Sequence, residues 1–301
     1  MNSIRIGTRK SKLARWQAEH IQALIAAMGH AAELVEFTTQ GDRVLDKPLP
    51  EIGGKGLFTQ ELESALLSGD IDLAVHSLKD LPTEFVIGAI PERGSPFDAL
   101  VTKHRCRMID LPQGALVGTS SHRRAAQLLA QRPDLIVKPI RGNVETRVRK
   151  VHEGEFDAAI LAVAGLQRLD MAEVIDEILT PEVMLPAPGQ GAIAVQARSG
   201  HLSDILQAID HLETRFAVTA ERTFLNTLDA GCSLPVAAYA HMQGNRLLMQ
   251  GRVSDLAGRR SITVTGDAPL QEGEALGRGL GQAALKEGAD MLLTTVRGES
   301  S

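Results

Sequence analysis

Four short segments of this 301-residue chain carry side chains that bind anions, and each directly follows a short apolar run. The segments are Thr8–Ser11, His76–Asp80, Ser120–Arg124 and Arg141–Asn143. Arginine and lysine form strong charge-assisted hydrogen bonds with carboxylates and phosphates, and serine hydroxyls add further donors. Any single arginine of this kind is more often a solvated surface residue. Four such segments in equivalent places predict a site for a small molecule with several anionic groups.

Asp80 is the unusual member of this set, because a carboxylate among cations opposes anion binding. One interpretation is an ion pair with Lys79 or a nearby arginine. The other is a carboxylate that stabilises a developing positive charge or moves a proton. His76 ends an apolar run, where a structural role is the commoner one.

The two cysteines, Cys106 and Cys232, make no disulfide framework and no zinc-site spacing, so we expect no metal. Cys106 lies in a polar stretch and can simply be an exposed thiol. Cys232 lies in a loop after Gly231, a residue that allows close approach of the backbone and can expose the sulfur. A lone loop cysteine usually has no chemistry. The segment Gly41–Lys55, rich in Gly and Pro, is either a lid or an ordinary long loop.

Short apolar runs alternate with amphipathic stretches, a pattern that predicts an α/β fold. Ser11 can cap a helix that ends at Gly29, and Gly69 can end another. Expected strands are residues 4–7, 34–38, 71–75, 86–90, 99–102, 115–119, 135–140 and 158–163, and further helices are 58–67, 123–130 and 144–153. The four charged segments then lie beyond strand ends, where open α/β sheets bind ligands at helix N-termini.

The last part of the chain follows a different pattern, with expected antiparallel strands at 236–241, 247–254 and 261–265 and a helix at 273–286. This predicts a small α+β domain. The Pro- and Gly-rich segment Met184–Gly191 is expected to be a hinge or crossover between domains.

The net charge of −5 argues against a general nucleic-acid binder. Residues 119–152, however, hold eight Arg and Lys against two acidic residues, which indicates a focused anion site. The N-terminal residues lack the apolar stretch of a signal peptide, and no later run is long enough to cross a bilayer. We therefore expect a cytoplasmic protein with no membrane partner.

Eight strings, spread in order over nearly the whole chain, resemble the porphobilinogen deaminase family. They are IRIGTRKSKLA (4–14), GGKGLFTQELE (53–63), DLAVHSLKDLPT (72–83), VGTSSHRRAAQL (117–128), IRGNVETRV (140–148), AAILAVAGLQRL (158–169), LPAPGQGAIAVQAR (185–198) and LDAGCSLPVAAYA (228–240). The resemblance implies two α/β domains like those of periplasmic binding proteins, with an interdomain cleft, plus a small C-terminal α+β domain. The implied boundaries are 1–96 with 190–211, then 97–189, then 212–301.

The activity that the resemblance implies is that of a transferase, hydroxymethylbilane synthase, in tetrapyrrole (porphyrin and haem) biosynthesis. Four porphobilinogen molecules condense head to tail with release of ammonia on a dipyrromethane cofactor, and hydrolysis releases hydroxymethylbilane. The cofactor would be held by a thioether to Cys232. The protein is expected to be a monomer.

The resemblance also assigns individual residues. Asp80 would be the catalytic carboxylate. The cofactor would contact Cys232, Lys79, Asp80, Ser121, Arg123, Arg124 and Gly142, and the substrate would contact Arg9, Ser11, Lys55, Phe58, Arg141, Arg147 and Arg168. Asp42 matches a position near the lid. His122 departs from the family pattern, which usually has an apolar residue there, and this affects the expected local packing.

Two other classes of protein fit part of the pattern. A solute-binding protein would have two lobes around an anion site, but it predicts a secretory signal and gives no role to Cys232. A nucleic-acid-binding module would use the basic region from Arg123 to Lys150. It predicts salt-sensitive binding, yet aromatic residues for base stacking make up only 3% of the chain.

Overall fold

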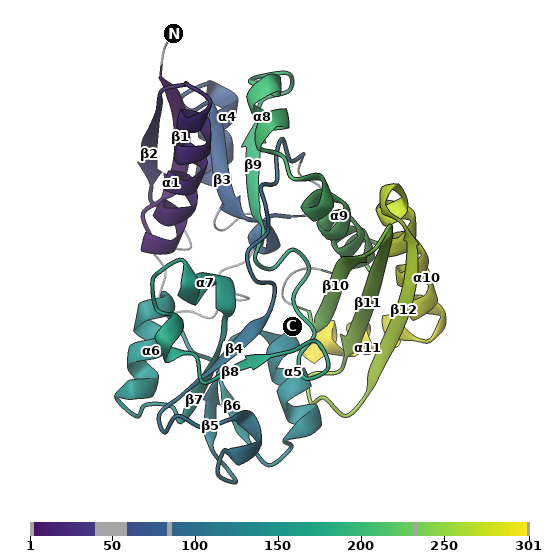
Figure 1. Ribbon diagram of the computed structural model, residues 1–301. Helices are drawn as coiled ribbons and strands as arrows, with labels where there is room; N and C mark the ends of the chain where they lie inside the picture. The colour runs from purple at the N-terminus through teal and green to yellow at the C-terminus, as the bar shows by residue number, and fades with distance from the viewer. Residues whose placement is uncertain (1–2, 40–58, 83–85, 231–233, 300–301) are drawn as a thin grey trace. The chain divides into compact units, whose positions relative to one another are not determined.

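The computed structural model describes residues 3–39, 59–82, 86–230 and 234–299. The chain divides into two compact units (Figure 1). The first consists of Met1–Gly94 and Ala192–Arg215, and the second of Ser95–Gly191 and Phe216–Ser301. The division into three domains stays a prediction. Among the described residues, no helix is both long and apolar enough to cross a membrane.

The first unit is built on a four-stranded sheet in the order β2-β1-β3-β9. Its strands are β1 (Ile4–Arg9), β2 (Ala32–Phe37), β3 (Leu73–Ser77) and β9 (Ile193–Ala197). The first three are parallel, with Ile6 opposite both Leu34 and Leu73, whereas β9 runs antiparallel to β3. The parallel strands therefore end at one edge of the sheet, which carries two of the four charged segments.

Helices α1 (Lys12–Ala27), α4 (Gln60–Ser68) and α8 (Ser203–Ile209) accompany this sheet. Ile21 and Ile25 of α1 are fully buried against the strands, in the core cluster that also holds Ile6 and Val195. The expected ends of α1 and α4 are confirmed. Gly29 and Gly69 both have the positive φ that ends a helix, and Gly69 is the C-cap of α4.

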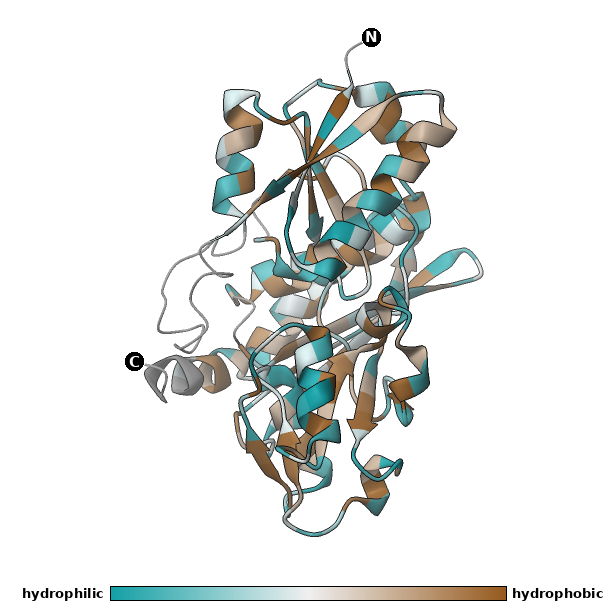
Figure 2. Cartoon of the chain, turned by 90° about the vertical axis from the view of Figure 1, so that its left-hand side faces the viewer, coloured by the Kyte–Doolittle hydropathy of each residue, from teal (hydrophilic) through white to brown (hydrophobic). Residues whose placement is uncertain are grey.

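The second unit holds a five-stranded sheet in the order β6-β5-β7-β4-β8. The strands are β4 (Asp98–Thr102), β5 (Leu116–Gly118), β6 (Ile136–Lys138), β7 (Ala158–Ala162) and β8 (Glu177–Leu179). Strands β5, β6 and β7 are parallel, whereas β4 is antiparallel to both of its neighbours. Every residue of β4 is buried, and the central strands carry the brown of apolar residues in Figure 2. Each of the three parallel strands is followed by a helix. These helices are α5 (His122–Gln131), α6 (Val144–His152) and α7 (Val163–Gln167).

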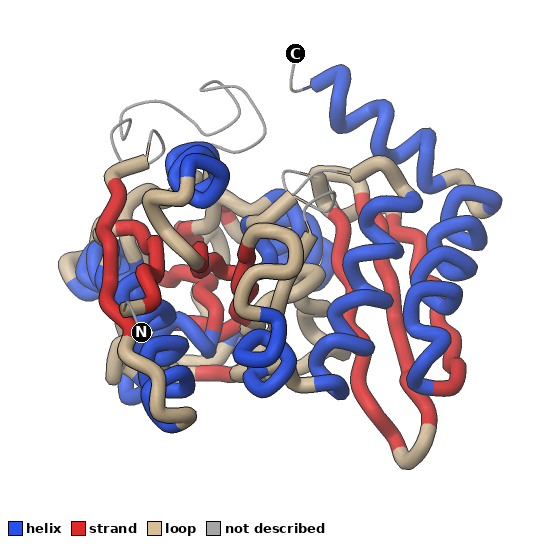
Figure 3. The backbone as a smooth tube through the Cα atoms, turned by 90° about the horizontal axis from the view of Figure 1, so that it is seen from above, coloured by secondary structure: helices blue, strands red, loops and turns tan. Residues whose placement is uncertain are grey.

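A separate antiparallel sheet follows helix α9 (Leu212–Thr227). It consists of β10 (Val236–Gln243), β11 (Arg246–Ser254) and β12 (Ser261–Pro269), with helices α10 (Gly273–Lys286) and α11 (Ala289–Glu299). Figure 3 shows α10 lying along the three strands, and the fully buried Phe224 of α9 packs in the same core. Gly251 makes room for its ring, because a Cβ there would lie 2.5 Å from Phe224 Cζ. The expected small α+β element is confirmed.

Secondary structure departed from expectation in a few places. The strand expected at residues 86–90 is wrong, because only Ala89 forms an isolated bridge, to Val195. The strands β8 and β9 and the helices α7, α8 and α11 were not expected. Met184–Gly191 lies at the end of a segment of the second unit. The chain passes into the first unit at Ala192 and then forms β9.

Candidate active site

Asp80 ends a single turn of 3₁₀ helix, η1 (Leu78–Asp80), directly after β3. Leu78 and Leu81 on either side of it are 0% and 1% exposed, so the turn is fixed by buried side chains. The backbone N–H of Leu78 also donates to the carbonyl of Ala192, with an N···O distance of 3.0 Å. Asp80 itself is exposed and Lys79 is half-buried. The fold thus presents a carboxylate to solvent from a rigid support.

Arg9 and Ser11 lie at the same sheet edge, because β1 is parallel to β3 and adjacent to it. Ser11 caps α1, as expected, with its Oγ accepting from the N–H of Ala14 at 3.3 Å. A hydroxyl that accepts at its oxygen still has a hydrogen to donate, and the helix N-terminus adds a partial positive charge. Arg9 is half-buried beside it. This end of the sheet is built to attract a negative group.

His76, near the end of β3, is buried with only 6% exposure. Burial and the positive charge of Arg9 together lower the pKa of His76 to about 4, although a hydrogen bond with Gln196 raises it in part. The imidazole is therefore neutral at pH 7. This fits the expected structural role better than that of a cation in the anion site.

Ser121 caps helix α5 in the second unit. Its Oγ accepts from the N–H of Arg124 at 3.4 Å, and its own N–H donates to Thr119 Oγ1 at 3.2 Å. His122, the residue that departs from the family pattern, is the half-buried first residue of the helix. The helix therefore begins one residue before the expected start at 123, with histidine as its first residue.

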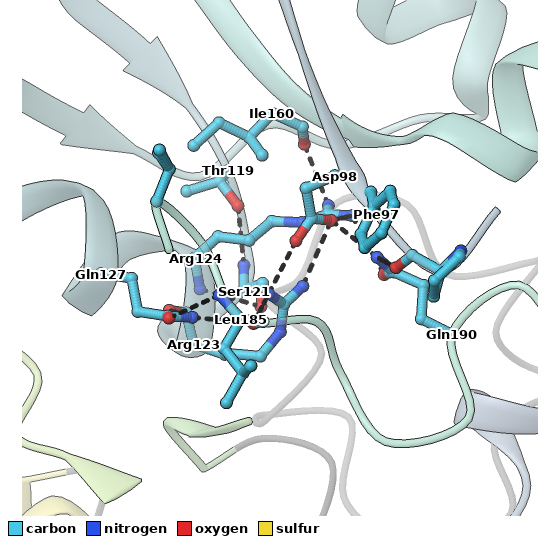
Figure 4. Close-up of polar contacts among 12 residues, drawn as sticks. Phe97, Asp98, Thr119, Ser121, Arg123, Arg124, Gln127, Ile160, Leu185 and Gln190 are labelled. Carbon is cyan, nitrogen blue, oxygen red and sulfur yellow. Dashed lines mark hydrogen bonds and ion pairs between the residues drawn. The ribbon is translucent and has the colours of Figure 1, made fainter. Parts of the chain in front are cut away.

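The next two residues of α5, Arg123 and Arg124, converge on a residue that the sequence did not point out (Figure 4). This residue is Asp98, the fully buried first residue of β4. Arg123 Nη1 donates to Asp98 Oδ2 at 2.7 Å, and Arg124 Nη2 donates to Asp98 Oδ1 at 2.7 Å. Gln190 Nε2 donates to the same Oδ1 at 2.9 Å. A buried Arg–Asp–Arg cluster thus forms within the second unit.

The electrostatics of this cluster are dominated by charge pairing. Burial raises the pKa of the Asp98 carboxyl, but attraction to Arg123 and Arg124 outweighs burial and holds that pKa well below its usual range. Burial lowers the pKa of Arg123, and the charge of Asp98 opposes this. The pairing therefore favours the charged forms of Asp98 and Arg123.

A signal that could have marked Asp98 is its place in the sequence, immediately before the expected strand 99–102. A carboxylate beside a buried strand needs partners, because an unpaired charge in the interior is costly. Gln190 lies in the LPAPGQG string and had no separate signal.

Helix α6 begins with a third polar cap. Asn143 Oδ1 accepts from the N–H of Thr146 at 2.9 Å, and the preceding Gly142 has a φ of +112° that favours glycine. The carbonyl of Gly142 accepts from Arg147 Nε at 2.8 Å, which fixes the base of that side chain. Arg141 is half-buried beside them. The expected basic segment therefore lies at a helix N-terminus.

Arg168 directly follows α7 and is half-buried. Its Nη2 donates to the carbonyl of Gly191 at 2.6 Å. Burial lowers the pKa of Arg168 to about 10, so the guanidinium is still positive at pH 7. The second unit therefore contains five of the arginines assigned by the resemblance: Arg123, Arg124, Arg141, Arg147 and Arg168.

The remaining assigned residues, Lys55, Phe58 and Cys232, lie outside the described residues, as do Asp42 and the segment 41–55. Their roles stay predictions. Cys106 is half-buried and packs against the core cluster around Leu100 and Met108 rather than lying free in a polar stretch.

Comparison with known proteins gives a consistent result. Residues 4–204 match the family model "Porphobilinogen deaminase, dipyromethane cofactor binding domain". Residues 215–286 match "Porphobilinogen deaminase, C-terminal domain". A porphobilinogen deaminase of Syntrophotalea carbinolica is 46% identical over 98% of this chain and 96% of its own. One of Chromobacterium violaceum is 46% identical over 99% of each chain.

Among solved structures, the methionine-binding protein MetQ aligns with 69% of this chain and 88% of its own. The identity is 14% and the TM-score is 0.42, so this likeness is weak.

Proposed function

The chain belongs to the porphobilinogen deaminase family, and on that premise we propose that it is a hydroxymethylbilane synthase of tetrapyrrole biosynthesis. It condenses four porphobilinogen molecules head to tail, releases ammonia, and yields hydroxymethylbilane. The observation that carries this proposal is the match of both family domains, over residues 4–204 and 215–286. The assignment of residues within the two units supports it.

The residues of the second unit fit a dipyrromethane, whose acetate and propionate groups are carboxylates. Ser121 and Asn143 cap two helices at whose N-termini arginines gather, and such termini favour anions. Arg123 Nε is buried and has no hydrogen-bond partner within the described residues, so one donor is left over for a ligand. Attached to Cys232, the dipyrromethane would supply the pyrrole carbon that is extended.

Asp80 would act on the substrate at the moment when ammonia leaves. Positive charge then develops on the pyrrole of porphobilinogen, and its N–H becomes a stronger donor. A carboxylate that accepts this hydrogen bond stabilises the charge as it forms. Because Leu78 and Leu81 are buried, the backbone that carries the Asp80 carboxylate does not have to be ordered by the substrate.

The cations would bind the carboxylates of the substrate and hold the reacting carbons in place. Arg9 and Ser11 do so from the first unit, and Lys79 lies next to the catalytic carboxylate. Arg141, Arg147 and Arg168 do so from the second unit, and Lys55 and Phe58 are proposed to assist.

Substitution of Asp80 tests the reaction. Asp80→Asn removes the charge of an exposed side chain, so the urea midpoint should be unchanged while kcat falls by a factor of about 100 or more. The measurement is porphobilinogen consumed and ammonia released in equal amounts. Asp110→Asn is a matched control, because Asp110 also ends an exposed 3₁₀ turn before a buried leucine, Leu111. Normal turnover by Asp80→Asn would remove Asp80 from this role.

The proposal extends to a cytoplasmic protein that acts as a monomer. The scarcity of cysteine, with only Cys106 and Cys232 in the sequence, supports a reducing compartment. Analytical ultracentrifugation at assay concentration tests the monomer, and a stable dimer that dissociates with loss of activity would contradict it.

A further inference from the structure

The buried cluster around Asp98 combines unequal numbers of charges. Two guanidiniums, whose side chains are 5% and 8% exposed, share one carboxylate whose side chain is 0% exposed. The three groups together carry one net positive charge. A buried charge without a partner is strongly unfavourable, so the cluster is suited to one more negative group.

Both carboxylate oxygens of Asp98 already accept hydrogen bonds within the cluster, and its negative charge would repel an anionic ligand. Its Oδ1 accepts from Arg124 Nε at 2.9 Å, from Arg124 Nη2 at 2.7 Å and from Gln190 Nε2 at 2.9 Å. Its Oδ2 accepts from Arg123 Nη1 at 2.7 Å. Any effect of Asp98 on a bound molecule must therefore pass through the two arginines.

The arginines are fixed from a second side by backbone carbonyls. Arg123 Nη1 also donates to the carbonyl of Leu185, and Arg124 Nη1 donates to that of Ile160, each at 2.9 Å. Gln190 Nε2 in turn donates to the carbonyl of Pro96 at 2.7 Å. These bonds leave Arg123 Nε as a buried donor without a partner in the described part of the chain.

We infer that Asp98 is a positioning residue for the reaction. It fixes Arg123 and Arg124 in one geometry, and it leaves the cluster with one net positive charge, which one carboxylate can neutralise. It acts before any ligand is bound, by preventing the two like charges from separating. The inference rests on the proposed function, because it assumes that these arginines bind a carboxylate group of dipyrromethane or substrate.

The test compares three variants for fold, cofactor content and kinetics. Asp98→Asn removes the charge and retains the shape. Asp98→Glu retains the charge but moves it by one methylene, and it is the second variant to measure in case the first does not fold. Asp176→Asn is the matched control, because Asp176 is a buried aspartate (side chain 4% exposed) that holds the other end of β4 through Thr102 and Arg105.

Intact mass gives a readout that does not depend on turnover. We expect the fraction of Asp98→Asn that carries dipyrromethane, or its rate of loading from porphobilinogen, to fall at least about tenfold. The part that is loaded should show a raised KM. Asp98→Glu should show the same effects at smaller size. Asp176→Asn should lose stability but load fully with an unchanged KM.

Two results would overturn the inference. One is normal loading and normal KM in Asp98→Asn, or in Asp98→Glu if the first variant does not fold. The other is an equal loss of loading in Asp176→Asn, which would make reduced stability the cause. Measurements on the wild-type protein distinguish failure of this inference from failure of the proposed function. If the wild type itself carries no dipyrromethane and adds no pyrroles, it is the proposed function that fails.

Discussion

Two aspartates, Asp80 of the first unit and Asp98 of the second, show how different the surroundings of one residue type can be. Asp80 is exposed on a turn held by buried leucines, whereas Asp98 is buried between two arginines. The catalytic role of Asp80 stays a prediction, but the residue could be singled out in the sequence because of the cations near it. The role of Asp98 could not, because its partners are 25, 26 and 92 positions away and only the folded sheet brings them together.

His76 makes a prediction at the same scale. Burial lowers its pKa from 6.5 to about 4, so the unfolded chain binds a proton in this range that the folded protein does not bind. The stability due to the neutral histidine is complete above pH 6.5 and is lost as the pH falls toward 4. The loss amounts to as much as about 3 kcal/mol.

Urea unfolding between these pH values measures the effect. His76→Gln has no proton to gain and should show a shallower fall in the free energy of unfolding than the wild type. The same substitution at the exposed His104 serves as the control. Equal slopes for His76→Gln and the wild type would show that His76 does not cause the change.

At the scale of elements, the helix ends were the most predictable features. Capping depends on neighbouring residues, so Ser11, Gly29 and Gly69 could be read directly from the sequence. The strand expected at 86–90 failed for the opposite reason. Its pairing depends on β9, more than 100 positions later, and only Ala89 meets that strand.

Ser11 allows capping to be separated from anion binding. Ser11→Ala removes the cap of α1 and should cost about 1 kcal/mol of stability. Ser11→Asp provides an equally good cap but adds a negative charge, so it should retain stability while kcat/KM falls at least about tenfold. Urea midpoints and steady-state kinetics of both variants give the comparison. Unchanged kcat/KM in Ser11→Asp would contradict an anion site at this helix.

Gly142 provides a second prediction about an element. An alanine there would have a strained φ of +112° and a Cβ 2.7 Å from Thr146 Cγ2 in the first turn of α6. We expect Gly142→Ala to lose at least about 2 kcal/mol of stability and to raise KM by displacing Arg147.

The control for this variant is Gly114→Ala, because Gly114 has a φ of +75° but nothing within 4 Å of a new Cβ. It should lose only about 1 kcal/mol, from backbone strain alone. Equal losses in the two variants would show that contact with Thr146 contributes nothing.

At the scale of the whole molecule, the sequence predicted two α/β sheets and a small antiparallel sheet but not their edges. Apolar runs predicted the parallel strands one by one, but their order in the sheets, β2-β1-β3 and β6-β5-β7, is not their order along the chain. Strands β8 and β9 come back to sheets formed earlier, and β4 is antiparallel to its neighbours, which no local pattern reveals. The chain consequently divides into two units, each assembled from two separate segments.

The intact mass of the purified protein, before and after incubation with porphobilinogen, tests the central claim most directly. The proposed function predicts an increment of two linked pyrroles at rest, located on the Cys232 peptide and absent from Cys232→Ser, and stepwise pyrrole additions after substrate is supplied. A well-folded protein of unmodified mass that porphobilinogen never changes would contradict the claim and favour a binding protein without this chemistry.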